Sequence, residues 1–138
     1  MSNDDASVSI QAELWVEHAS AALEFYQRAF GARVVHRIGD GDDIVAQLAI
    51  GRAYFWVSAA DHGSGRFSPE AMHGATGRTL LVVEDPEAVV RAAIGAGATI
   101  KAEVAEEHGW RLGQVLDPYG HEWEIGKPTV PWPPASQS

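Results

Sequence analysis

Residues 8–32 read VSIQAELWVEHASAALEFYQRAFGA, and this stretch decides the fold class. Over residues 8–16, apolar side chains occupy every even position, and polar or aromatic ones occupy the odd positions. Such alternation predicts a strand with one buried face. Residues 20–30 then repeat apolar side chains at helical spacing, between Ser20, a candidate N-cap, and Gly31, which favours a helix end. The stretch therefore predicts a strand followed by a helix of about three turns.

The rest of the chain extends this pattern and then repeats it. Three short strand candidates follow the helix, ARVVHRI, IVAQLAI and AYFWVS, with GDGDD as a hairpin turn between the first two. A second strand, RTLLVV, leads to a helix that Asp85 and Pro86 begin, and three more strands follow, ATIKAEV, WRLGQVLD and EWEIG. The sequence therefore predicts an α+β fold made of two βαβββ modules.

An internal duplication explains the repeat. Gly31 ends the first helix and Gly97 ends the second, an offset of 66 residues (97 minus 31). At that offset Leu14 meets Leu80, Val16 meets Val82 and Leu23 meets Val89. We expect one domain over residues 1–138, with module 1 at about 8–58, a linker at 59–76, module 2 at about 77–126 and a proline-rich tail at 127–138.

Composition excludes several classes of partner and site. The 138 residues are 46% hydrophobic, enough for a real core, and the formal net charge of −9 opposes binding to nucleic acid or to anionic membranes. The chain has no cysteine, so disulfides and thiolate sites are excluded. It shows neither a signal sequence nor the roughly 20 apolar residues of a membrane span. We therefore expect the protein to reside in the cytoplasm.

The motifs FYQRAFGA in the first helix and DPYGHEWEI in the last hairpin, on this duplicated unit, resemble those of the vicinal oxygen chelate superfamily. That group includes glyoxalase I, extradiol dioxygenases, bleomycin-resistance proteins and PhnB-like proteins, the last of which the motifs resemble most. The resemblance implies that the modules curl into cup-shaped half-barrels around a ligand cavity, often across a homodimer. It leaves function open, because this fold hosts lyases, isomerases, dioxygenases and drug binders that catalyse nothing.

The resemblance also implies four metal-ligand positions, one on the first and one on the last strand of each module. They fall on Gln11, near Arg78, on Ser58 or Trp56, and on Glu124. Gln11 and Glu124 suit a metal, whereas the others are poor ligands. Arg78 repels a cation and would rather pair with Glu124 or with an acidic group of the ligand. Catalytic sites normally keep at least three protein ligands. We therefore expect no cofactor, with a divalent Ni, Zn, Fe or Mn ion on Gln11 and Glu124 as the alternative.

The odd face of the first strand is expected to line the cup. Aromatic walls with a few amide and carboxylate groups suit a planar, hydrophobic or aromatic ligand, and the acidic groups favour a cationic one. For any single tryptophan, packing in the core is at least as good an explanation. The predicted ligand contacts are Gln11, Glu13, Trp15, Trp56, Ser58, Arg78, Trp110 and Glu124.

The leading functional prediction is metal-independent binding of such a molecule, for example resistance to an antibiotic or other natural product by sequestration, in a homodimer. The alternative is a metal-dependent lyase, isomerase or dioxygenase of the glyoxalase superfamily, with Glu13 or Glu124 as general base and His121 or Arg78 as electrophilic partner. A third possibility is a scaffold whose proline-rich tail contacts other proteins. The segment Asp117–Gly120 predicts a type I turn, after which His121 is expected to be structural.

Overall fold

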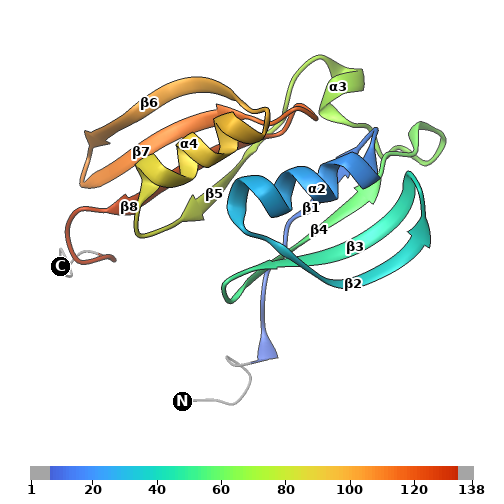
Figure 1. Ribbon diagram of the computed structural model, residues 1–138, viewed down its shortest axis with the longest axis horizontal. Coiled ribbons are helices and arrows are strands. Elements are labelled where there is room, and N and C mark those ends of the chain that lie inside the picture. Colours follow the sequence, from blue (N-terminus) through green and yellow to red (C-terminus); the bar gives the residue numbers. More distant parts are fainter. Residues whose placement is uncertain (1–6, 134–138) are drawn as a thin grey trace.

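The computed structural model describes residues 7–133, in which each half of the chain forms a four-stranded mixed sheet with one helix on one face (Figure 1). Module 1 has the strand order β1-β4-β3-β2 and consists of β1 (Glu13–Val16), α2 (Ala19–Phe30), β2 (Arg33–Asp40), β3 (Asp43–Ile50) and β4 (Ala53–Ala59). Module 2 has the order β5-β8-β7-β6 and consists of β5 (Arg78–Val82), α4 (Pro86–Ala96), β6 (Thr99–Glu107), β7 (Trp110–Leu116) and β8 (Glu122–Pro128). The prediction of an α+β protein with two βαβββ modules is confirmed.

The linker between the modules is more ordered than the sequence predicts. It contains a 3-10 turn at His62–Ser64 and a single helical turn, α3 (Pro69–Met72). Ser68 caps α3, because its Oγ accepts a hydrogen bond from the backbone N–H of Ala71 at 3.1 Å. The end of the proline-rich tail, residues 134–138, lies outside the described residues.

Strand β1 is shorter than the sequence predicts. Its residues Glu13–Val16 pair with β4, and the Trp56 N–H also donates to the oxygen of Ala12 at 2.8 Å, so the pairing with β4 ends near Ala12. Val8 and Ile10, which the alternation places on a buried face, are 71% and 98% exposed. Only Leu14 and Val16 fulfil that part of the prediction.

The helix ends follow the predicted signals in part. Helix α2 is preceded by His18 as its N-cap, so the prediction of Ser20 at that position is wrong. Asp85 does cap α4, because its carboxylate accepts the N–H of Ala88 at 3.1 Å, and Gly31 ends α2 with a φ of 68°. Within the part of the chain that the structure describes, no helix is long and apolar enough to cross a membrane.

The internal repeat has two offsets, not one. Helix α2 has 12 residues and α4 has 11, so the glycines that end them, Gly31 and Gly97, are 66 residues apart while the strands before them are 67 apart. Burial shows the larger offset, because Leu14 and Leu81 (81 minus 14) are 6% and 8% exposed whereas Leu80 is 45% exposed. The sequence-based pairing of Leu14 with Leu80 is therefore wrong by one residue.

The two modules share one aromatic core. Tyr26 and Phe30 of α2 pack on Trp123 of β8, with ring centroids 5.6 and 4.7 Å away, and Phe55 of β4 lies 5.7 Å from the same indole. Helices α2 and α4 pack against each other in the middle of the molecule (Figure 1). Trp123 thus proves to be a core residue, as the simplest explanation for any single tryptophan expects.

A buried carboxylate ties α2 to the last hairpin. Asp117 is 3% exposed and accepts four hydrogen bonds: from the Tyr26 hydroxyl, from Trp123 Nε1 at 3.0 Å, and from the backbone N–H groups of Tyr119 at 2.9 Å and His121 at 3.0 Å. Burial, and then the adjacent carboxylate, raise the pKa of Tyr26 well above its ordinary value, which keeps the hydroxyl protonated and donating. This network fixes module 2 against module 1.

Candidate ligand-binding site

Each sheet has one face turned away from its helix, which we call its open face. In module 1 the helix side carries the buried Leu14 and Val57, so the residues that alternate with them lie on the open face. In module 2 the helix side carries Trp123 and Ile125. All eight predicted contacts lie on open faces, five on module 1 and three on module 2: Gln11, Glu13, Trp15, Trp56 and Ser58, then Arg78, Trp110 and Glu124. Their contact with a ligand stays a prediction.

Gln11 is the centre of a polar cluster on the open face of module 1. Its side-chain oxygen accepts hydrogen bonds from Trp56 Nε1 at 2.9 Å and from Gln47 Nε2 at 3.0 Å. The sequence analysis missed Gln47, although β3 places it directly beside Trp56 in the sheet register. Because two donors already use this oxygen, Gln11 is occupied within its own sheet.

Glu13 organises the neighbouring part of the same face. Its Oε1 accepts hydrogen bonds from Ser58 Oγ and from Trp15 Nε1, each at 3.3 Å. These are long bonds, so they orient the carboxylate weakly and leave its second oxygen available. Three of the predicted contacts are therefore one connected group.

The open face of module 2 carries an ion pair. Arg78 Nη1 lies 3.6 Å from Glu124 Oε2, with the two side chains 44% and 26% exposed. The predicted preference of Arg78 for Glu124 is confirmed. An exposed pair at this distance contributes little to stability, so its importance is in the charge that it neutralises on this face.

Strand register decides which position in module 1 corresponds to Glu124. β1 pairs with β4 so that Glu13 faces Trp56, and β5 pairs with β8 so that Leu80 faces Glu124. Glu13 and Leu80 are equivalent at the 67-residue offset (80 minus 13), so their partners are equivalent too. Of the two alternatives that the sequence left open, Trp56 is selected and Ser58 is not.

The four positions at which a metal is implied therefore form two pairs, Gln11 with Trp56 and Arg78 with Glu124. An indole offers only a donor, and a guanidinium repels a cation. Among residues 7–133, no group of three or more His, Cys, Asp or Glu side chains is placed to hold a metal ion. These residues do not fit the metal of related enzymes, while metal-independent action stays a prediction.

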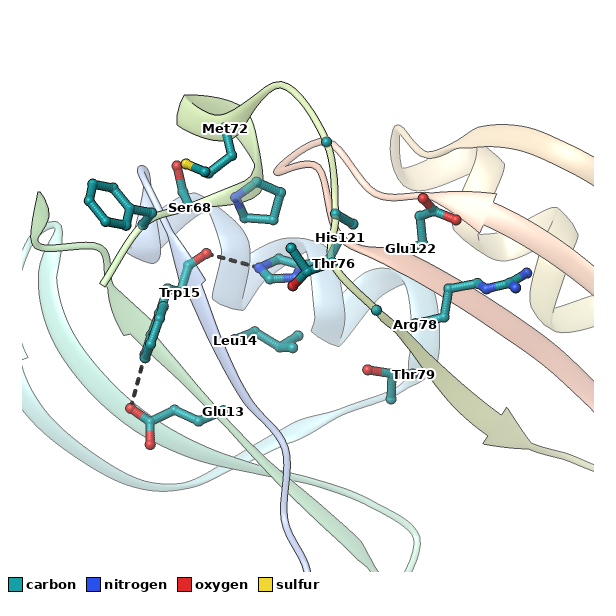
Figure 2. A pocket seen from close by; sticks show the side chains of 15 residues that line it. Glu13, Leu14, Trp15, Ser68, Met72, Thr76, Arg78, Thr79, His121 and Glu122 are labelled. Carbon is teal, nitrogen blue, oxygen red and sulfur yellow. Dashed lines mark hydrogen bonds between the residues drawn. The ribbon is translucent and has the colours of Figure 1, made fainter. Parts of the chain in front are cut away.

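A cavity of about 340 Å³ lies where the edge strands β1 and β5 approach each other (Figure 2). β1 contributes Glu13 and Trp15, and β5 contributes Arg78, so three predicted contacts meet here. The linker forms another wall with Phe67 and Met72. The sequence analysis missed these two because the linker has no periodic pattern, although the capping sequence Ser-Pro-Glu that starts α3 was a signal for an ordered turn.

His121 lies between the two edge strands in this cavity (Figure 2). It follows the predicted turn, which the Gly120 N–H closes on the oxygen of Asp117 at 3.1 Å. His121 Nε2 is 2.9 Å from the backbone oxygen of Trp15 and donates to it, since a carbonyl oxygen can only accept. The side chain thus joins β1 to the start of β8, and the expected structural role of His121 agrees with this contact.

Charge in the cavity is unevenly balanced. Glu13 and Glu122 both line it, and Arg78, the one guanidinium among its lining residues, is already paired with Glu124. The cavity is therefore acidic, on a chain whose formal net charge is −9. Such a lining attracts a cationic group and disfavours an anionic one.

Trp110 is placed apart from this cavity. Its ring packs edge to face on Trp132, with the centroids 5.2 Å apart, and Trp132 is 53% exposed. The backbone between them folds back on the β6–β7 hairpin, because the Thr129 N–H donates to the oxygen of Gly109 at 2.7 Å. The structure therefore does not bring Trp110 to the other predicted contacts.

Comparison with known proteins shows which family has this architecture. Residues 9–125 match the family model of the Glyoxalase/Bleomycin resistance protein/Dioxygenase superfamily. Over 126 residues the chain is 30% identical to the uncharacterised protein Mb0911c of Mycobacterium bovis, a match that covers 87% of this chain and 83% of that protein.

Solved structures share the fold, as two examples illustrate by their similarity to this chain. The Arabidopsis thaliana gene product At5g48480 has a TM-score of 0.70 and 30% identity, over 87% of this chain and 98% of that chain. TnmS3, an antibiotic binding protein from Streptomyces sp. CB03234, has a TM-score of 0.63 and 18% identity, over 88% of this chain and 98% of that chain. At that identity the second likeness shows the fold alone.

Proposed function

Because the chain belongs to the Glyoxalase/Bleomycin resistance protein/Dioxygenase superfamily, we propose that it binds an aromatic small molecule without a metal and protects by sequestration. The observation that carries the proposal is the contrast between two sets of residues. Gln11 and Glu124, the two residues that suit a metal, are not among the residues that line the cavity, whereas Glu13, Trp15 and Arg78 line it together, with Arg78 also paired with Glu124. Recognition, not metal chemistry, is the function that this arrangement supports best.

The cavity has the size and lining of a small-molecule site. Its volume of about 340 Å³ is at the lower end of the range for ligand pockets, roughly 300–1,000 Å³. Trp15 and Phe67 supply aromatic surface for stacking, and Met72 supplies an adaptable thioether. A compact planar ligand, or the aromatic part of a larger one, fits these walls.

The acidic lining selects among aromatic ligands. Glu13 and Glu122 favour one that carries an amine or another cationic group, which would also gain from the faces of Trp15 and Phe67. Antibiotics and other natural products with a basic nitrogen belong to this class. The antibiotic-binding neighbour TnmS3 supports the proposal at the level of the fold.

The test begins with a thermal-shift screen of cationic aromatic natural products against the full chain. A ligand present at about 100 times its Kd should stabilise the folded state by about 2.7 kcal/mol, enough for a clear rise in Tm. Each hit is titrated by quenching of tryptophan fluorescence, and the ligand is then recovered and weighed by mass spectrometry. Sequestration predicts that it returns unchanged.

Matched tryptophan variants locate the site. Trp15→Leu should weaken binding at least tenfold, the loss of about 1.4 kcal/mol expected when a stacking surface goes. Trp132→Leu, at an exposed tryptophan outside the cavity, should leave affinity unchanged. Equal losses in both variants, or no loss in Trp15→Leu, would place the ligand elsewhere.

A metal-dependent lyase, isomerase or dioxygenase remains the alternative. Elemental analysis that finds one tightly held Ni, Zn, Fe or Mn ion per chain would overturn metal-independent binding. Turnover of a hit, abolished in Glu124→Gln, would replace sequestration by catalysis with Glu124 as the base.

A second copy of this chain is the proposed protein partner. The open faces expose apolar side chains that a monomer leaves in water, with Val45 and Tyr54 on module 1 and Leu80 and Val82 on module 2 each more than 40% exposed. Light scattering should give twice the mass of 14.8 kDa. Val82→Glu should reduce it to the monomer mass, because a carboxylate buried in an apolar interface lacks a partner.

A further inference from the structure

The linker wall of the cavity is a small substructure of its own. We call residues 66–73 the lid, which contains α3 and contributes Phe67 and Met72 to the cavity. Both side chains are also exposed, at 46% and 57%, so they lie at the boundary between cavity and solvent. In Figure 2 the lid crosses above Trp15 and His121. Its position decides how open the cavity is.

Glu17, just after β1, contacts Ser68 of the lid and also His62, which precedes the lid and whose ring packs on Phe67 with the centroids 5.4 Å apart. One carboxylate oxygen, Oε2, accepts a hydrogen bond from Ser68 Oγ and lies 3.1 Å from His62 Nε2. Ser68 is fully buried, whereas His62 is 47% and Glu17 32% exposed by side chain. A buried hydroxyl of the lid is thus fastened to a carboxylate that solvent can reach.

The first residue of the lid, Arg66, forms a backbone bridge with Asp61 inside the linker, with N–H to oxygen distances of 2.9 and 3.0 Å. The lid's remaining side-chain hydrogen bonds run within the linker, from Arg66 to Asp61 and from the Ala71 N–H to Ser68. Gly65, at its start, has a φ of 82°, and neither Gly65 nor Gly74 has another atom within 4 Å of where a Cβ would lie. Glycine at both ends allows backbone angles that other residues rarely adopt.

On the far side the lid rests on module 2 without a polar bond. A Cβ added to Gly120 would come within 2.8 Å of Pro69 Cβ, so α3 sits close against the turn before β8. This apolar contact helps to set where the lid lies when it is closed. Breaking this contact when the lid opens leaves no buried polar group without a hydrogen-bond partner. Within residues 7–133, the bond from Ser68 to Glu17 is therefore the side-chain hydrogen bond that ties the lid to a residue outside the linker.

We propose that residues 66–73 close over the cavity as a hinged lid, and that Glu17 is the positioning residue that keeps the lid shut through Ser68 and His62. The proposal rests on the proposed function for its ligand, because a lid matters only where the cavity is filled. With the lid shut, Phe67 and Met72 cover a bound molecule. With it open, the molecule enters or leaves.

Acid should release the lid. The hydrogen bond from Ser68, and then that from His62, hold the pKa of Glu17 below its usual 4.5, with His18 adding a small electrostatic effect in the same direction. A depressed carboxyl pKa means that the closed state is favoured above the usual value and loses that advantage as pH falls through the lowered one. His62 and His18 are the imidazole side chains that face Glu17.

Opening can be measured without any ligand. The chain has no cysteine, so Met72→Cys gives a single site for an oxazine dye, and Trp15, which lines the same cavity, quenches such a dye on contact. Fluorescence correlation then gives the equilibrium constant between the quenched, closed state and the bright, open one. Trp15→Phe in the labelled protein should abolish the signal, which identifies Trp15 as the quencher.

Glu17→Gln in the labelled protein should shift this constant about tenfold toward the open state, as expected when an acceptor of charge-assisted hydrogen bonds is neutralised. The control is Glu107→Gln, which removes a more exposed carboxylate beside a histidine, His108, far from the lid. It should leave the constant unchanged. As pH falls below 4.5 and through the lowered pKa of Glu17, the parent should open and Glu17→Gln should not respond.

An unchanged constant in Glu17→Gln, or an equal shift in Glu107→Gln, overturns the proposal. If Glu17→Gln fails to fold, His62→Gln at its more exposed position takes its place, with an expected shift of about threefold for one weaker hydrogen bond; no shift overturns the proposal equally. A lid that opens on a protein for which no ligand is found would contradict the proposed function alone. Ligand binding with an unresponsive lid would contradict this inference alone.

Discussion

The two modules repeat one topology and differ in the pair of residues at equivalent sites of their open faces. Module 1 has the neutral pair Gln11 and Trp56, joined by a 2.9 Å hydrogen bond and reinforced by Gln47. Module 2 has the charged pair Arg78 and Glu124, 3.6 Å apart. The two modules share these backbone positions. In module 1 the side chains form a rigid polar surface, whereas in module 2 they form a solvated charge pair. Duplication preserved the scaffold and left the chemistry of each face free to diverge.

The last turn of each module differs in the same way. Module 1 joins β3 to β4 through Gly51 and Arg52, whereas module 2 joins β7 to β8 through a longer turn that begins at Asp117. Only the second carries a buried carboxylate, which binds donors from both modules. We infer that the stability of the whole protein depends much more on the second turn than on the first.

Replacing Asp117 is the strongest way to test that inequality. Asp117→Asn puts an amide donor among four donors, so at least one buried N–H or O–H loses its acceptor, at an expected cost of about 3 kcal/mol in unfolding free energy. Urea denaturation measures it. Arg52→Ala, in the equivalent turn of module 1, should stay within about 0.5 kcal/mol. Similar losses in the two variants would remove the distinction between the turns.

Much of this architecture follows from the sequence, because local patterns set it. Alternation and helix-ending glycines give the order of all eight strands, and Asp85 caps α4 as its position predicts. The predicted offset of 66 residues is wrong for the strands before the helices, because α2 has one residue more than α4. Strand periodicity cannot reveal an insertion inside a helix. A shift of one residue is enough to exchange the buried Leu81 for the exposed Leu80.

The sequence predicts which residues of the candidate site share a strand face, but it does not predict which side chains contact each other. Alternation shows which residues share a face, but beyond the first strand it cannot say which face is open, nor that Trp56 donates to Gln11, which lies 45 residues earlier. The Asp117 network depends on Tyr26, 91 residues away, and the lid depends on Glu17 and Ser68, 51 residues apart. These pairings are set by how the modules pack, and no local period encodes them.

The loss of stability at alkaline pH should show that the Tyr26 hydroxyl of module 1 donates a hydrogen bond to the Asp117 carboxylate of module 2. Its pKa in the folded state is raised well above 10.0, while in the unfolded chain it ionises near 10, so stability is complete below about pH 10 and falls as pH rises further. Tyr26→Phe should cost about 1–2 kcal/mol at neutral pH, for one hydrogen bond to a charged acceptor, and should flatten the alkaline loss.

The control for this titration is Tyr54→Phe, which removes an exposed hydroxyl on the open face of module 1. Unfolding free energies from urea titrations between pH 7 and pH 11 should fall as steeply in this variant as in the parent. A Tyr26→Phe protein that keeps the full alkaline loss would show that another group is responsible.

The neutral pair of module 1 should contribute a moderate amount. Trp56→Phe keeps an aromatic ring and deletes the N–H donor to Gln11, with an expected loss of about 1 kcal/mol, since the Gln11 oxygen retains its bond from Gln47. Gln47→Leu should cost a similar amount, and the double variant should cost more than the sum, because it leaves the partly buried Gln11 oxygen without either donor. Strict additivity would mean that the cluster does not act as a unit.

The charged pair of module 2 should contribute least. Glu124→Gln breaks an ion pair that is 3.6 Å long and partly exposed, so the loss should be below about 0.5 kcal/mol and should shrink further at high salt. A double-mutant cycle with Arg78→Met isolates the pairwise part. A coupling well above that limit would make the module 2 pair as structural as the module 1 cluster. A coupling near zero means that stability does not constrain Arg78 and Glu124, so their charges remain available for contact with a ligand.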